Sequence, residues 1–151
     1  MKVLEQQIMK EYSNMKIGGK AKRLIIVENK EEMKEAYEKY DSLLLLGNGT
    51  NLLLNDGYLD YNFVSTEKLN RIEKLEKNRV YVEAGVDLDT LLAFMEKENL
   101  SGIEKMAGIP GSIGGLTYMN GGAFGTEIFD FIDEIEVLTE RNIIQSIKKK
   151  D

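Results

Sequence analysis

The chain has 151 residues, is 42% hydrophobic and 30% charged, and carries a formal net charge of −6 at pH 7. These values suit a globular protein with a buried core, and the acidic balance argues against a broad basic face that binds nucleic acid. The sequence has no cysteine and no histidine, which excludes disulfides, zinc sites built on those residues, and Cys–His or Ser–His catalysis within this chain.

The first predicted elements lie at the amino terminus. Lys2–Tyr12 is predicted to be a short amphipathic helix, and its charges and short apolar runs do not fit a signal peptide. We therefore expect no leader and no membrane insertion, and the lack of cysteine fits a reducing cytoplasm. Leu24–Val27 is a compact β-type run.

A strand–helix–strand unit follows. Asn29 is placed to cap a helix, with Glu32 three residues later as in a capping box. The apolar residues of this helix fall on one face: Met33, Ala36, Tyr37 and Tyr40. The uninterrupted run Leu43–Leu46 is typical of a strand buried on both faces in a parallel sheet. Together these segments predict a right-handed βαβ unit.

The pattern changes near Thr66 and favours hairpins. Arg71–Glu76 and Arg79–Ala84 are predicted to pair around Lys77-Asn78, where asparagine tolerates positive φ. A small α/β unit is therefore expected over residues 1–66, followed by a second, α+β unit rich in hairpins over residues 67–151.

A helix and a second hairpin are predicted further along. Asp87 or Asp89 caps the helix and Gly102 ends it. The residues expected to point inward are Leu91, Leu92, Met95 and Leu100. Asp133–Thr139 and Ile143–Ile147 are predicted to form the hairpin.

A glycine-containing loop directly follows the leucine strand. This first glycine segment is Gly47-Asn48-Gly49-Thr50-Asn51. Ligands of open α/β sheets bind at the carboxyl ends of strands, glycines allow close approach to the main chain, and successive N–H groups form anion-binding nests. Thr50 and Asn51 add side-chain hydrogen-bonding groups. The alternative is a plain tight turn.

The second glycine segment, Ala107–Thr126, has no charged residue and holds seven of the fourteen glycines and the only proline. Gly111, Gly114 and Gly115 permit tight packing around a ligand, and Ser112 and Asn120 supply polar groups. The apolar surface expected to face the ligand comes from Ile109, Ile113, Leu116, Met119 and Phe124. The alternative is a loop in which the glycines only serve packing.

Four motifs, in this order and spacing, resemble the UDP-N-acetylenolpyruvoylglucosamine reductase family: MKIGG (15–19), GNGTNLL (47–53), AGIPGSIGG (107–115) and MNGGAFG (119–125). The resemblance runs from about Ser13 to Ile147, and the last two motifs are its most specific part. The sequence departs from the family pattern at Thr50, Gly121, Phe124 and Thr126, where serine, alanine, tyrosine and glycine are common.

The resemblance implies an α+β, FAD-binding fold of the vanillyl-alcohol-oxidase type with the flavin between two subdomains. It implies that the first glycine segment lies at the FAD diphosphate. The cofactor-binding residues implied in the second are Gly111, Ser112, Gly114, Gly115 and Asn120. Because some relatives of this wider fold attach flavin through histidine or cysteine, the composition predicts non-covalent FAD here.

The resemblance also implies an activity and a missing part. The family reduces UDP-N-acetylenolpyruvoylglucosamine with NADPH for peptidoglycan synthesis, using an arginine, a serine and a glutamate that lie beyond the matched region. We therefore expect a chain that is truncated at its carboxyl end, lacks the substrate domain and is inactive alone, and we assign no catalytic or metal-binding residue. Two alternatives stay open: another FAD oxidoreductase acting on a sugar or hydroxy acid, and a non-enzymatic nucleotide-binding module.

Overall fold

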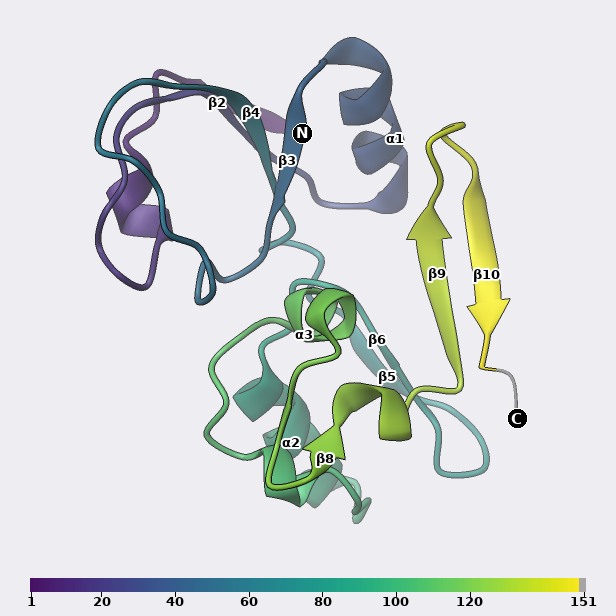
Figure 1. Ribbon diagram of the computed structural model, residues 1–151. Helices are drawn as coiled ribbons and strands as arrows, with labels where there is room; N and C mark the ends of the chain where they lie inside the picture. Colours follow the sequence, from purple (N-terminus) through teal and green to yellow (C-terminus); the bar gives the residue numbers. More distant parts are fainter. Residues whose placement is uncertain (150–151) are drawn as a thin grey trace.

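Residues 1–149 are described by a computed structural model (Figure 1). Its first half is a four-stranded sheet in the order β1-β2-β4-β3. The strands are β1 (Lys2–Glu5), β2 (Ala21–Ile26), β3 (Leu43–Leu46) and β4 (Leu59–Ser65). β1 pairs antiparallel with β2, whereas β2 and β3 both run parallel to β4, which lies between them. The parallel βαβ unit is therefore confirmed, with a later strand inserted at its centre.

Helix α1 (Lys30–Lys39) connects β2 to β3 and begins as predicted. The Asn29 side chain accepts a hydrogen bond from the Glu32 N–H at 2.9 Å. The Glu32 carboxylate accepts from the Glu28 N–H and not from Asn29, so the capping box is only half formed. Ala36 is fully buried, but Tyr37, expected on the inner face, is exposed.

Two expectations for this half are wrong. The predicted helix Lys2–Tyr12 is instead strand β1 followed by a 3₁₀ turn, η1 (Met9–Tyr12), because pairing with β2 outweighs a local helical pattern. β3 lies at the sheet edge, so Leu44 and Leu45 remain 37% and 54% exposed and the strand is not buried on both faces.

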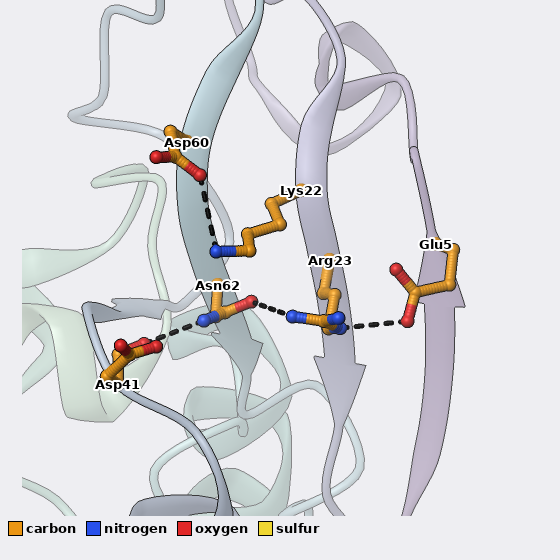
Figure 2. A network of polar contacts seen from close by, with 6 residues as sticks. All are labelled: Glu5, Lys22, Arg23, Asp41, Asp60 and Asn62. Carbon is orange, nitrogen blue, oxygen red and sulfur yellow. Dashed lines mark hydrogen bonds and ion pairs between the residues drawn. The ribbon is translucent and has the colours of Figure 1, made fainter.

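A row of polar side chains crosses the sheet at the middle of β4 and the amino end of β3 (Figure 2). Arg23 donates to the Glu5 carboxylate at 2.8 Å and to the Asn62 side-chain oxygen at 3.3 Å. Asn62, buried in β4, donates in turn to the main-chain oxygen of Asp41 at 2.7 Å. The row ties β1, β2 and β4 to the loop that begins β3, at the end of the sheet opposite the first glycine segment.

The predicted hairpin is present as β5 (Ile72–Lys74) and β6 (Val80–Val82). Lys77 and Asn78 have φ of 57° and 58°, as the central residues of a type I′ turn require. This part of the prediction is confirmed.

Helix α2 (Leu88–Lys97) begins at the predicted cap, because the Asp87 carboxylate accepts from the Thr90 N–H at 2.8 Å. The helix does not continue to Gly102. It ends before Asn99, whose φ of 54° turns the chain out of the helix. Met95 packs against the core of this half, which contains Val86, Leu88, Leu91, Ile103, Met106, Leu116 and Ile128.

The rest of the chain has short elements and one hairpin. The short ones are η2 (Glu104–Met106), α3 (Ile113–Met119), β7 (Gly122–Ala123), β8 (Thr126–Glu127) and η3 (Ile128–Asp130). β9 (Glu134–Leu138) and β10 (Ile144–Lys148) form the predicted hairpin. Within residues 1–149, no helix combines the length and apolar character needed to cross a membrane.

The β9–β10 hairpin lies beside α1, far from it in sequence (Figure 1). Asn142 donates to the Glu38 carboxylate at 2.6 Å and to the main-chain oxygen of Lys34 at 3.2 Å. Lys30 forms an ion pair with Glu136, and this hydrogen bond raises the pKa of the Lys30 ammonium. The β9–β10 hairpin, near the end of the chain, therefore packs back against α1 in the first half. Residues 150 and 151, the end of the predicted second unit, lie outside the described residues.

Candidate functional site

The two glycine segments, about sixty residues apart in sequence, meet in the structure. A Cβ added to Gly47 would lie 2.4 Å from Ser112 Oγ, and one added to Gly111 would lie 3.5 Å from Thr50 Oγ1. The fold therefore joins the carboxyl end of β3 to the residues just before α3. The predicted site residues at these contacts therefore lie close together.

The first glycine segment presents unpaired main-chain donors. It follows β3 at the same end as Ser65 of β4, because the two strands are parallel. Over residues 1–149, the N–H groups of Asn48, Gly49, Thr50 and Asn51 donate no hydrogen bond to the protein, and both asparagines are exposed. Such a run of free N–H groups is what an anion-binding nest requires.

A cavity of about 270 Å³ opens beside this segment. Its lining comes from the turn after η1, the first glycine segment and the end of β4: Glu11, Tyr12, Ser13, Asn14, Lys16, Gly47, Asn48, Ser65 and Glu67. The Asn14 N–H donates to Gly49 O at 3.0 Å and holds the turn on the segment. Residue-by-residue reasoning gave this turn no role, although Lys16 belongs to the first of the four family motifs.

The second glycine segment is not a loop throughout, because its centre forms α3. Ser112, 1% exposed, caps this helix by accepting from the Gly115 N–H at 3.3 Å. The N–H groups of Ile113 and Gly114 donate to Val86 O and Ala84 O at 2.7 and 2.8 Å. The first N–H groups of α3 are therefore already satisfied, and the free donors for an anion come from the first segment.

Two glycines expected to make room for a ligand are required by protein packing. Gly49 has φ of 63°, and a Cβ there would lie 2.0 Å from Tyr12 O. A Cβ on Gly114 would lie 2.7 Å from the Cβ of Ala84. These positions therefore require glycine for packing within the protein, and not, as predicted, for the close approach of a ligand. Gly115 differs, because it is exposed at the surface of α3.

Asn120 ends α3 in the left-handed conformation, with φ of 46°. Its side chain donates to the Glu127 carboxylate at 2.5 Å and accepts from the Phe129 N–H at 3.3 Å. Both ends of the amide are therefore used by the protein. A contact between Asn120 and a cofactor stays a prediction, and it requires a rearrangement of these bonds or a main-chain contact.

The apolar side chains of the second segment divide into two groups. Leu116 is buried, and Ile109 and Ile113 pack against the core, so they do not offer the ligand-facing surface expected of them. Met119 and Phe124 are 57% and 87% exposed and do offer apolar surface. Tyr118, which sequence reasoning did not select, is 88% exposed on α3 and adds an aromatic ring to this surface.

Taken together, these features fit the binding of FAD. The free N–H groups of the first segment suit a diphosphate, since main-chain nests bind anions without a basic surface. The exposed aromatic and glycine surface of the second segment suits a flat ring system. The cavity lining has one lysine against two glutamates, so an anion there depends on the main-chain donors and on that lysine.

Comparison with known proteins agrees with this fit. Residues 24–147 match the family described as the FAD binding domain, and the chain belongs to this family. FAD is accordingly the cofactor of its class.

The resemblance to UDP-N-acetylenolpyruvoylglucosamine reductases is confirmed. The chain is similar to the protein of that name from Fusobacterium nucleatum, with 57% identity over all of the chain and 54% of the relative. A Thermosipho melanesiensis reductase is 39% identical over 91% of the chain and 47% of its own length. The chain thus spans about half the length of the curated relatives it matches.

Solved structures support the fold. The Thermus caldophilus reductase structure matches with a TM-score of 0.85 and 30% identity, covering 98% of this chain and 53% of that one. CrmK, a flavoenzyme of caerulomycin biosynthesis, matches with a TM-score of 0.69 and 13% identity over 99% of this chain and 34% of its own. The expected flavoenzyme fold is confirmed.

Proposed function

We propose that this chain binds FAD non-covalently where its two glycine segments meet. The diphosphate lies at Gly47 to Asn51, and the flavin lies along the second segment at Gly111, Ser112 and the exposed face of α3 that holds Gly115. The contact between Gly47 and Ser112 carries the proposal, because it brings the free N–H groups of the first segment to the residues that begin α3. The absence of histidine and cysteine supports a non-covalent link.

In a protein of the relatives' length, this site serves the reduction of UDP-N-acetylenolpyruvoylglucosamine to UDP-N-acetylmuramate with NADPH, in cytoplasmic peptidoglycan synthesis. The names of the similar proteins support this activity. FAD, when bound, supplies the hydride. The residues of this chain position the diphosphate and the flavin ring.

The 151 residues alone are not expected to complete the reaction. Reduction of an enol ether conjugated to a carboxylate needs a placed proton donor and a group that supports the developing negative charge. The chain has no histidine or cysteine, and neither glycine segment contains arginine or lysine. The arginine, serine and glutamate that the family resemblance implies for these tasks lie beyond the matched region.

The test is a chimera in which this chain replaces the matching segment of the Fusobacterium nucleatum reductase. With NADPH and saturating FAD, mass spectrometry is expected to detect UDP-N-acetylmuramate over many turnovers from the chimera and none from the chain alone. Turnover by the chain alone would refute the division of tasks. A folded, flavin-loaded chimera without activity, beside an active parent enzyme, would refute the proposed activity and favour another flavin oxidoreductase.

A further inference from the structure

Lys16 is the one cationic side chain that lines the cavity beside the first glycine segment, within the part of the chain that the structure describes. The other charged groups of that lining are the carboxylates of Glu11 and Glu67. A ligand with two phosphate charges is repelled by these carboxylates, and the chain as a whole is acidic. One local cation therefore has a large share in whether an anion stays in this cavity.

The main chain holds the base of Lys16 in place. The Lys16 N–H donates to Ser13 O at 3.0 Å, which closes a tight turn, and the Asn14 N–H donates to Gly49 O at 3.0 Å. Lys16 has φ of 55°, a left-handed backbone conformation that residues other than glycine and asparagine seldom adopt. The turn thus places the backbone of Lys16 beside the first glycine segment.

The ammonium group is also free to take a ligand. Lys16 is exposed, and over residues 1–149 it makes no ion pair. Lys22, Lys30 and Lys74 are by contrast paired with carboxylates. A lysine ammonium on a flexible stem is a point charge well suited to phosphate oxygens.

We propose that Lys16 binds the diphosphate of FAD, opposite the main-chain donors of the first glycine segment. The inference rests on the proposed FAD site and adds to it a side chain that its main-chain donors do not include. Glu11 and Glu67 have the opposite effect, so that the cavity selects its ligand by a balance of one cation against two anions.

The experiment measures dissociation constants of ADP and FAD by calorimetry at low and high salt. ADP carries the diphosphate without the flavin. Lys16→Gln is expected to weaken both ligands about tenfold at low salt, since a hydrogen bond to a charged group is lost. The effect shrinks at high salt because the lysine is exposed. Lys16→Arg retains the charge and most of the affinity.

Two control variants separate local from general charge effects. Lys20→Gln removes the same charge from an exposed lysine outside the cavity lining and is expected to leave both constants unchanged. Glu67→Gln removes a carboxylate from the lining and is expected to tighten ADP severalfold. Circular dichroism spectra that match wild type show that the folds are intact.

The outcomes distinguish this inference from the FAD site itself. Wild-type affinity in Lys16→Gln, or an equal loss in Lys16→Gln and Lys20→Gln, overturns the role of Lys16 and leaves the FAD site standing. Failure of the wild-type chain to bind either ligand overturns both. A loss for FAD with no change for ADP also overturns the inference, because it places Lys16 at the flavin and not at the diphosphate.

Discussion

Gly47→Ala tests the contact that joins the two glycine segments. The φ of Gly47 lies outside the left-handed region, so alanine fits the backbone, but its Cβ would lie 2.4 Å from Ser112 Oγ. The hydroxyl relieves the clash only by rotating away from the Gly115 N–H that it caps. Loss of such a cap costs about 1 kcal/mol, and overpacking without rotation costs about 1–3 kcal/mol.

The partner variant Ser112→Ala isolates this contact. It removes the cap itself, at about 1 kcal/mol, and leaves Ser112 Cβ as the nearest atom, 3.6 Å from the new methyl group, which is ordinary contact. Gly47→Ala is therefore expected to cost almost nothing in the Ser112→Ala background. The two substitutions should couple by about 1 kcal/mol, since the double variant loses the cap only once.

The assay is urea unfolding of the four proteins, with the midpoint compared at constant slope. Each 1 kcal/mol also lowers the melting temperature by about 2–4 °C in a chain of this size. Gly57→Ala is the matched control, because its Cβ meets only the Asn55 side chain, whose oxygen lies 3.1 Å away and accepts from the Gly57 N–H, so any cost has no part in the Ser112 cap. Gly57→Ala should add independently to Ser112→Ala. If the costs of Gly47→Ala and Ser112→Ala also added independently in the double variant, the contact would be refuted.

Three further predictions concern the flavin and α1. Acid precipitation of the FAD-loaded chain should release all of the flavin into the supernatant, and colour retained by the denatured protein would show a covalent link. Asn29→Ala should destabilise the chain by about 1 kcal/mol in urea unfolding, because the Glu32 N–H loses its acceptor; an unchanged midpoint would refute the cap. The pKa of the Glu32 carboxyl is lowered by the amino-terminal ammonium and the Glu28 N–H, so its contribution is present above the ordinary pKa of about 4.3 and is lost as pH falls through the lower folded value. Glu32→Gln should therefore flatten the acid side of the stability–pH curve, and an unaltered curve would contradict this.

Local signals predicted the parts of the fold that depend on neighbouring residues. Asn29 and Asp87 cap their helices because short polar side chains reach the N–H groups three residues ahead. Lys77-Asn78 forms the turn because the hairpin needs positive φ there. None of these features needs knowledge of a distant segment.

The errors arise where distant pairing decides. The residues of β1 have a helical pattern, but they form a strand because they pair with β2. The residues of β3 have the pattern of a buried strand, but β4 occupies the centre of the sheet and leaves β3 at its edge. β4 itself was not predicted. Helix α3 is hidden by its glycines, whose low helix propensity is offset by the cap at Ser112 together with the packing of Leu116 and Ile113 against the core. Local sequence also says nothing of the contact between Gly47 and Ser112, and the family resemblance implied only that both segments lie at the same FAD.

The visible absorption spectrum of FAD mixed with the purified chain, followed by gel filtration, tests the central claim most directly. A flavin held at the joined glycine segments should show absorption bands shifted from those of free FAD and should elute with the protein. ADP should displace it, because both ligands use the donors of the first segment. A spectrum identical to that of free FAD, with all flavin eluting apart from the protein, would contradict the account.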